Sequence, residues 1–204
     1  MEPKKLKVIL IGDSSVGKTT LISRWDEDQF NQNVLPTINA GIVNINVEID
    51  EKNYILQVWD TAGQEKYRAL VSSYFQDSLA AMIVCDITLR QSFINIRQWV
   101  DVLNSSASDV PFLFVANKYD LVEQGQCQDF VKYEEIQQVS DELNCPFFIT
   151  SARTGNGVNE AFQTLADLAL APRITPSPTP IPQPQTVEIN QKDKQKQNEQ
   201  KDCC

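Results

Sequence analysis

Short apolar segments alternate with segments of helical periodicity along the first 170 residues. Buried strands are predicted at a short apolar stretch, residues 6–11, and at three continuous apolar runs, residues 79–85, 112–116 and 147–150. Between and after them, apolar residues recur at helical spacing over residues 92–103, 133–143 and 158–170. Strands that alternate with helices predict an α/β sheet with right-handed crossovers.

A different pattern occurs at residues 43–49 and 54–59, where apolar and polar side chains alternate. The polar residues 50–53 separate the two stretches, which therefore predict an antiparallel hairpin. The expected fold class is α/β: a mostly parallel, six-stranded sheet with one antiparallel strand and helices on both faces.

Composition excludes several classes of function. The 204 residues carry 18 basic and 27 acidic side chains, a net charge of −9, and no basic stripe stands out, which disfavours nucleic acid as a partner. The sequence has no histidine and no Cys-x-x-Cys pair, which excludes His-dependent triads and disfavours a transition-metal site. No apolar run is long enough to span a bilayer, and no signal-peptide pattern precedes the first strand, so we expect a cytoplasmic protein.

The chain divides by composition into two parts. Residues 1–171 have the pattern of a globular domain, with Cys85 and Cys145 in apolar surroundings where unpaired thiols are expected to be buried. Residues 172–204 begin with six prolines in thirteen residues, continue as a Gln/Lys-rich stretch and end in Cys203 and Cys204. We expect this second part to be a disordered tail that begins with a stiff spacer.

Residues 12–19 read GDSSVGKT and fit the pattern G-x-x-x-x-G-K-[ST], between the first predicted strand and a predicted helix. In that context, backbone N–H groups and the helix N-terminus form a concavity for phosphate. Lys18 would reach the β- and γ-phosphates, and the Thr19 hydroxyl would bind Mg²⁺. The alternative is an ordinary strand-to-helix turn in which Lys18 is a solvated charge.

Polar loops follow three further strands, at residues 60–65, 117–120 and 151–153. Because ligands of open α/β sheets bind at the carboxyl ends of the strands, these loops are expected to share one site with residues 12–19.

Taken together, the segments GDSSVGKT, WDTAGQEKYR, NKYD and SAR and the terminal Cys-Cys resemble the Rab branch of the Ras-like small GTPases. The resemblance covers about residues 4–170 and implies a P-loop NTPase G domain that binds GTP and GDP with Mg²⁺. It also implies slow GTP hydrolysis, because no arginine matches a built-in arginine finger and an activating protein would supply that charge. A P-loop kinase or ATPase is disfavoured by NKYD, whereas a nucleotide-bound, hydrolysis-poor membrane adaptor is the alternative kept open.

The resemblance assigns roles residue by residue. Gln64 would orient the attacking water, with Lys18 as its catalytic partner, and Gly63 would donate its N–H to the γ-phosphate. Mg²⁺ would be held by Thr19, Thr37 and Asp60; for Asp60 the alternative is a cap of the following turn. Asp120 suits guanine because a carboxylate accepts from both N1–H and the exocyclic amine, and Ala152 would donate its N–H to guanine O6. The remaining nucleotide-binding candidates are Ser14, Ser15, Val16, Gly17, Thr20, Phe30, Asn117, Lys118, Ser151 and Arg153.

The sequence departs from the Rab pattern around Thr37. Asn39-Ala40-Gly41-Ile42 stands where the family continues with glycine, an aliphatic residue, aspartate and phenylalanine, and Val34 replaces a frequent aromatic. Ile42 is still expected to join Trp59 and Tyr74 in an apolar triad that effectors contact. In our interpretation, nucleotide binding survives these changes. What they affect is which effectors bind and how well the segment around Thr37 is ordered.

The implied partners follow from the same resemblance. They are an exchange factor, a GTPase-activating protein, a GDP-dissociation inhibitor with a prenylation escort, and effectors that contact the triad. Cys203 and Cys204 resemble the Rab signal for double lipidation, and two lipid chains are what stable anchoring requires in the absence of a basic patch. We expect a monomer, peripheral on the cytosolic face of an endomembrane and active in vesicle trafficking.

Overall fold

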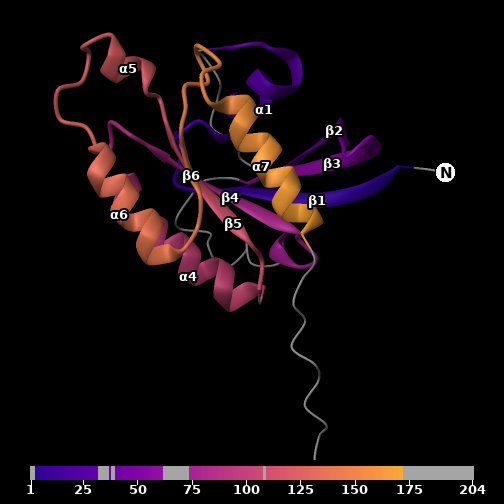
Figure 1. The fold of residues 1–204 in the computed structure, drawn as a ribbon. Helices are drawn as coiled ribbons and strands as arrows, with labels where there is room; N and C mark the ends of the chain where they lie inside the picture. The colour runs from indigo at the N-terminus through magenta and orange to yellow at the C-terminus, as the bar shows by residue number, and fades with distance from the viewer. Residues whose placement is uncertain (1–2, 32–36, 38–39, 62–73, 108, 172–204) are drawn as a thin grey trace, which may run out of the picture. The chain divides into compact units, whose positions relative to one another are not determined.

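A six-stranded sheet forms the centre of the domain (Figure 1). The computed structural model describes residues 3–31, 37, 40–61, 74–107 and 109–171. The strands are β1 (Lys4–Ile11), β2 (Gly41–Ile49), β3 (Lys52–Asp60), β4 (Ala80–Asp86), β5 (Phe112–Asn117) and β6 (Phe147–Ile149), in the spatial order β2-β3-β1-β4-β5-β6. Only the β2–β3 pair is antiparallel, so the predicted fold class is confirmed.

Helices cover both faces of the sheet (Figure 1). Those in the described residues are α1 (Lys18–Glu27), α3 (Arg90–Ile94), α4 (Ile96–Ser106), α5 (Asp120–Glu123), α6 (Tyr133–Leu143) and α7 (Val158–Leu170). The core on one face includes residues of α1 and α7, and the core on the other includes residues of α3, α4 and α6.

The central strands supply both cores because their side chains alternate between the two faces. On β1, Leu6, Val8 and Leu10 belong to the α1–α7 side. Ile9 and Ile11 belong to the opposite side, and all five side chains are buried. This two-sided burial explains why residues 8–11 of β1 are all apolar.

Three details differ from the sequence-based expectation. The helix expected over residues 92–103 is two helices, α3 and α4, with Asn95 between them, and the four-residue α5 was not expected. The hairpin turn is tighter than the expected four residues: only Asp50 and Glu51 lie between the strands, with φ of 50° and 59°. Two successive positive φ angles are typical of the two-residue turns that match strand twist.

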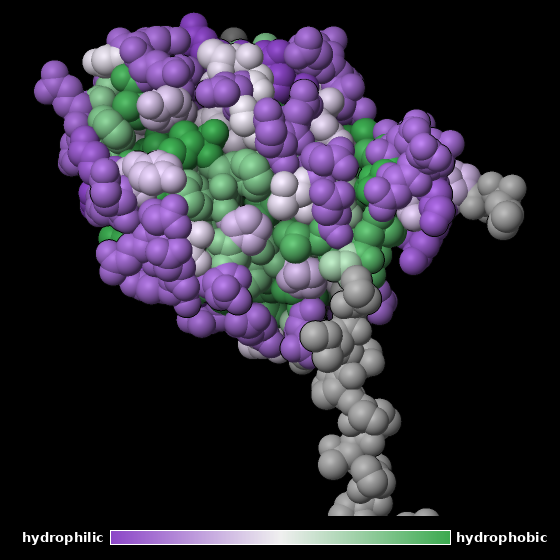
Figure 2. Space-filling model, viewed as in Figure 1, coloured by the Kyte–Doolittle hydropathy of each residue, from purple (hydrophilic) through white to green (hydrophobic). Residues whose placement is uncertain are grey.

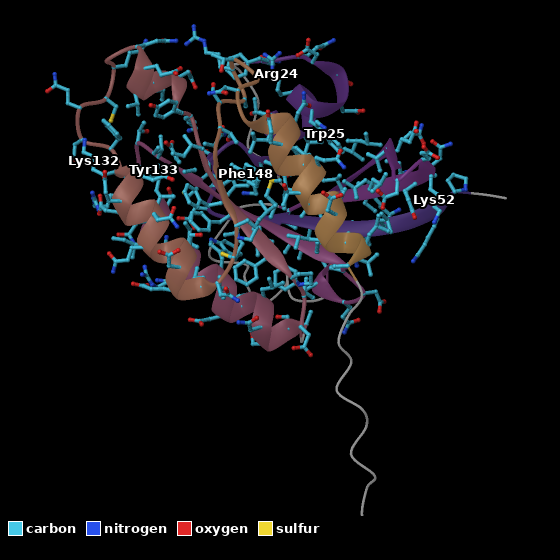
Figure 3. The ribbon with its side chains drawn as sticks, in the orientation of Figure 1. Arg24, Trp25, Lys52, Lys132, Tyr133 and Phe148 are labelled. Carbon is cyan, nitrogen blue, oxygen red and sulfur yellow. The ribbon has the colours of Figure 1, made fainter. Side chains whose placement is uncertain are left out.

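Strand β6 is an edge of the sheet and only three residues long, and each of its side chains is half-buried. In the space-filling view, hydrophilic side chains line the outer side of α6, and less polar surface lies between α6 and α7 (Figure 2). Phe148 of β6 is found in this region (Figure 3). Within the described residues, no helix has both the length and the apolar character needed to cross a bilayer.

Strands β1, β3, β4, β5 and β6 run in the same direction. Their carboxyl ends therefore lie at the same end of the sheet. The candidate functional site is built at this end of the sheet.

Candidate functional site

The loop at residues 12–19 approaches its neighbours so closely that two positions accept only glycine. A Cβ on Gly12 (φ +142°) would lie 2.1 Å from the carbonyl oxygen of Val84. A Cβ on Gly17 (φ +101°) would lie 2.4 Å from Nδ2 of Asn117. Both φ values are also ones that residues with a side chain rarely adopt. The glycines of the motif thus set the path of the loop between β1 and α1.

Lys18 is the first residue of α1, and its side chain folds back over the loop. Nζ donates to the carbonyl oxygens of Gly12 (2.9 Å) and Asp13 (2.7 Å), and the residue is only 5% exposed. Burial lowers the pKa of Lys18 to about 8, although the charges of Asp60 and Asp13 act in the opposite direction. An ammonium group in this position gains most from a nearby anion, because little water is left to solvate it.

The carboxylate of Asp13 connects the loop to the opposite face of the sheet. Oδ2 accepts from Nδ2 of Asn95 (2.6 Å), and Oδ1 accepts from Nε1 of Trp99 (2.9 Å). Asn95 is the residue between α3 and α4. Sequence reasoning missed this contact, because the motif leaves the residue after its first glycine unspecified.

Thr19, Thr37 and Asp60 come together from three separate segments. Thr19 Oγ1 donates to Asp60 Oδ2 (2.5 Å) and lies 2.8 Å from Thr37 Oγ1. The hydroxyl of Thr37 lies 3.5 Å from the same carboxylate oxygen. Burial raises the pKa of Asp60, while the hydrogen bond from Thr19, the charge of Lys18 and the hydroxyl of Thr37 lower it.

Asp60 Oδ1 is buried and finds no hydrogen-bond partner within the described part of the chain. A buried carboxylate oxygen without a partner is costly, and a cation is the ligand that satisfies it. No group of three or more His, Cys, Asp or Glu residues occurs among the residues described, so a site held by many carboxylates is not present there. One carboxylate with two hydroxyls fits Mg²⁺, which keeps several waters and phosphate oxygens in its octahedral shell.

Asn117 joins the loop after β5 to two other loops. Nδ2 donates to the carbonyl oxygen of Val16 (3.0 Å). Oδ1 accepts from Oγ1 of Thr150 (3.2 Å) and from the backbone N–H of Ala152 (3.2 Å). All these groups are buried, so this amide fixes the position of residues 12–19 relative to the loop after β6.

Asp120 lies beside the loop after β6. Its Oδ1 accepts from Oγ of Ser151 (2.7 Å), and Oδ2 lies 3.9 Å from the guanidinium of Arg153.

Lys118 has a positive φ of 70°, and its Nζ pairs with Asp86 Oδ2 at 2.7 Å. Asp86, at the end of β4, is a second residue that sequence reasoning missed; an aspartate after an apolar strand carries no distinguishing signal.

The other predicted residues have the following placements. Ser14, Ser15 and Val16 lie in the loop, with Ser15 at φ 62°, and Thr20 lies in the first turn of α1. Phe30 follows α1 and is exposed. Gly63, Gln64, Val34, Cys203 and Cys204 lie outside the described residues.

The three residues of the expected apolar triad are neighbours. Ile42 of β2 pairs with Trp59 of β3, and the rings of Trp59 and Tyr74 are 5.7 Å apart. Ile42 is 48% exposed. Nζ of Lys7 lies 4.4 Å from the centre of the Trp59 ring. The triad therefore brings together residues of β2, of β3 and of the segment before β4.

Comparison with known proteins assigns the family. The sequence profile of the Ras family matches residues 7–171. Ras-related protein RIC1 of Oryza sativa subsp. japonica is 40% identical over 161 residues, 78% of each chain. GTP-binding protein ypt2 of Schizosaccharomyces pombe is 38% identical over 162 residues, 79% of each chain. Ras-related protein RABD2a of Arabidopsis thaliana is 39% identical over 161 residues, 78% of this chain and 77% of its own. The chain therefore belongs to the Ras family and, within it, is a Rab-family small GTPase, a GTP-binding and GTP-hydrolysing switch in trafficking.

Proposed function

We propose that this GTPase depends on Mg²⁺, discriminates guanine from adenine through Asp120, and recruits effectors to a membrane in its GTP-bound state. The observation that supports the proposal most is the group formed by Thr19, Thr37 and Asp60, with a buried Asp60 oxygen that has no partner in the described residues. That group lies within electrostatic reach of the buried Lys18.

In this proposal the phosphate end is held by backbone N–H groups of residues 12–19 and by Lys18. Nζ of Lys18 would exchange one of its present carbonyl partners for phosphate oxygens, since a charged oxygen is the stronger acceptor. Thr19 and Thr37 would hold Mg²⁺ through their hydroxyls, and Asp60 would hold it through a water. When bound, the ion neutralises charge on the β- and γ-phosphate oxygens.

At the other end of the site, the guanine base would be recognised by hydrogen bonds. The carboxylate of Asp120 accepts from two neighbouring donors, an arrangement that guanine offers and adenine lacks. Ser151 already donates to Oδ1 of Asp120 and fixes the orientation of the carboxylate. Ala152 would donate its N–H, which faces Asn117 Oδ1, to guanine O6 as well, and the Lys118 stem, oriented by Asp86, would lie over the base. That one relative carries the name GTP-binding protein supports the same base.

Hydrolysis would depend on Gln64, which orients the attacking water. We expect the intrinsic rate to be low, because stabilisation of the developing charge by an arginine from an activating protein accelerates comparable reactions by about 10³–10⁵. Thr37 would change its contacts when the γ-phosphate leaves, which gives effectors two states of the neighbouring triad to distinguish.

Attachment to the membrane would depend on Cys203 and Cys204. One lipid chain binds a bilayer marginally, so we expect Cys203→Ser and Cys204→Ser each to weaken membrane binding strongly. Flotation of the lipidated protein with vesicles measures this, and Cys127→Ser, a cysteine in a loop of the globular domain, is the matched control. Membrane binding that survives both terminal substitutions would contradict this part of the proposal.

The test of the whole proposal is single-turnover GTP hydrolysis by purified protein, after identification of the nucleotide that purifies with it. We expect bound GDP, slow hydrolysis that requires Mg²⁺, and a further decrease in Gln64→Leu. Gln163→Leu, the same change on the exposed surface of α7, is the matched control and should leave the rate unchanged. Absence of a guanine nucleotide would overturn the proposal. Bound nucleotide with a rate indifferent to Gln64 would instead favour the hydrolysis-poor membrane adaptor.

A further inference from the structure

Arg24 of α1 connects this helix to the loop after β6, which lies more than a hundred residues later in the chain. Nε donates to the carbonyl oxygen of Ala152 (2.7 Å), and Nη2 donates to that of Arg153 (2.8 Å). Nη1 donates to the carbonyl oxygen (2.9 Å) and to the carboxylate (2.8 Å) of Asp28. The side chain is only 15% exposed, and Figure 3 shows it at the loop that leads into α7.

The loop itself is a closed turn, so a contact at two of its carbonyls fixes it as a unit. Gly155 N–H donates to the carbonyl oxygen of Ser151 (2.8 Å), and Thr154 N–H donates to Oγ of Ser151 (3.1 Å). The helices on either side are also in contact, because Trp25 of α1 stacks on Phe162 of α7 with ring centres 4.3 Å apart. Arg24 thus adds oriented polar contacts to an apolar contact between the same two elements.

Ala152 is the residue through which Arg24 reaches the base site. Its N–H faces Oδ1 of Asn117, and its carbonyl faces Arg24. The same N–H is the group expected to donate to guanine O6, so a fixed carbonyl also restricts where that donor lies. A donor held in place before the ligand arrives binds more tightly than one that must be ordered on binding.

Helix α1 also contains two of the residues proposed to bind the phosphates and Mg²⁺. Lys18 and Thr19 form its first turn, and Asp28, which ends it, accepts from the same guanidinium that holds the loop. A helix is a rigid element over this length, so Arg24 relates the position of the base donors to the position of the phosphate ligands.

We propose that Arg24 is a positioning residue that sets how long guanine nucleotide stays bound, by holding residues 151–153 against α1. The inference rests on the proposed function, because it concerns the same site. Arginine suits the role better than lysine, since its planar guanidinium donates to three carbonyls and a carboxylate at once, whereas an ammonium is a compact point charge.

The experiment measures dissociation of ribose-labelled fluorescent GDP from full-length protein in Mg²⁺. In Arg24→Met, which keeps the length of the stem and removes all donors, we expect release to be at least about tenfold faster, the size of change that loss of charged hydrogen bonds produces. Arg24→Lys should fall between wild type and Arg24→Met. Arg97→Met, the same change at an exposed ion pair with Glu142, is the matched control and should release GDP at the wild-type rate.

A second variant separates the two contacts of the guanidinium. Asp28→Ala removes the exposed carboxylate and leaves the bonds to Ala152 and Arg153 in place. We expect less than a twofold change in release, because an ion pair with a carboxylate as exposed as that of Asp28 contributes little. A change as large as that of Arg24→Met would locate the effect at the end of α1 and overturn the role assigned to the loop.

The last measurement distinguishes positioning from general destabilisation. The ligand 6-thio-GDP has sulfur, a weaker hydrogen-bond acceptor, in place of O6. If Arg24 acts through the Ala152 N–H, the preference of wild type for GDP over 6-thio-GDP shrinks in both Arg24 variants, whereas a protein that is merely less stable loses affinity for both ligands equally. An unchanged preference in Arg24→Lys, or release of GDP at the wild-type rate from Arg24→Met, overturns the inference alone. A wild-type protein that binds no guanine nucleotide overturns it together with the proposed function.

Discussion

The two ends of the site are built in different ways. The phosphate end consists mainly of eight consecutive residues, 12–19, whose path is set by two glycines that approach Val84 and Asn117 too closely to carry a side chain. The base end joins loops after β5 and β6 through hydrogen bonds of Asn117 and Ser151, with Arg24 behind them. The first end depends on backbone shape, and the second depends on side chains that are distant in sequence.

This difference determines how each end is expected to fail. A methyl group added at Gly12 meets backbone atoms of Val84, and one added at Gly17 meets the side-chain amide of Asn117. A side chain removed at the base end leaves its partners in place but unsatisfied. Substitutions at the two ends therefore distinguish steric from polar causes of lost binding.

The largest effect is expected for Gly12→Ala. Its Cβ would lie 2.1 Å from the Val84 carbonyl oxygen of β4, so the loop or the strand must move. We expect the free energy of unfolding, measured with urea, to fall by more than about 3 kcal/mol. Gly41→Ala is the control, because no atom lies within 4 Å of the added Cβ and the φ there is not positive. Equal stability of the two variants would show that the close approach of residue 12 to the Val84 backbone does not exclude a side chain.

The next largest effect is expected at the base end for Asp120→Asn. The amide offers a donor where guanine also presents donors, so GDP affinity should fall by at least about a hundredfold. Affinity for xanthosine diphosphate should rise, because its C2 carbonyl accepts a hydrogen bond. Competition binding measures both. A parallel loss of affinity for both nucleotides would indicate collapse of the loop and not a change in base reading.

Asn117→Ala tests the connection between the two ends. It removes the acceptor of Thr150 and Ala152 and the donor to Val16, all of which are buried. We expect a loss of about 2 kcal/mol in the free energy of unfolding, since buried polar groups lose their partners. The control is Asn44→Ala, which removes only an exposed acceptor of Gln57. If both variants cost the same, Asn117 does not connect the ends in the way its contacts indicate.

The smallest effect is expected far from either end, at the ion pair of Arg90 with Glu135. The hydrogen bond from Arg90, followed by that from the Lys132 N–H, lowers the pKa of Glu135 to about 2. A carboxylate with a lowered pKa stabilises the fold above its unfolded pKa near 4.5 and loses that contribution as the pH falls toward 2. The difference in urea midpoint between wild type and Glu135→Gln should therefore be small and should shrink from pH 6 to pH 3.

A control for that pH dependence is available on the same helix. Glu134→Gln changes the same charge one residue earlier, and the Glu134 carboxylate makes no hydrogen bond or ion pair with the residues that the structure describes. A difference in midpoint that grows as the pH falls for Glu135→Gln would contradict the prediction.

The sequence predicted one end of the site more completely than the other. Residues 12–19 were recognisable because phosphate binding requires glycines, a lysine and a hydroxyl at fixed spacing in one segment. The six strands were recognisable because each keeps one hydrophobic pattern over its length. These features are local, and local patterns are what a sequence displays.

What the sequence did not predict depends on pairs of distant residues. Asp13 is held by Asn95 and Trp99, and the carbonyls of Ala152 and Arg153 are held by Arg24. Aspartate, asparagine, tryptophan and arginine also occur in helices and loops without such contacts. The type of these residues therefore does not indicate the contacts. The tight turn at Asp50 and Glu51 was missed for another reason: neither residue is the glycine that usually accompanies positive φ.

The partners of Asn117 have a consequence for synthesis on the ribosome. The phosphate loop is complete once residue 19 has been made, but the amide that connects it to the base site waits for Thr150 and Ala152. Until those residues leave the exit tunnel, the proposed base site is incomplete, and guanine nucleotide would not stabilise the nascent domain. During synthesis, GTP or GDP would therefore stabilise this domain only after residue 152 has emerged, when all six strands have been made.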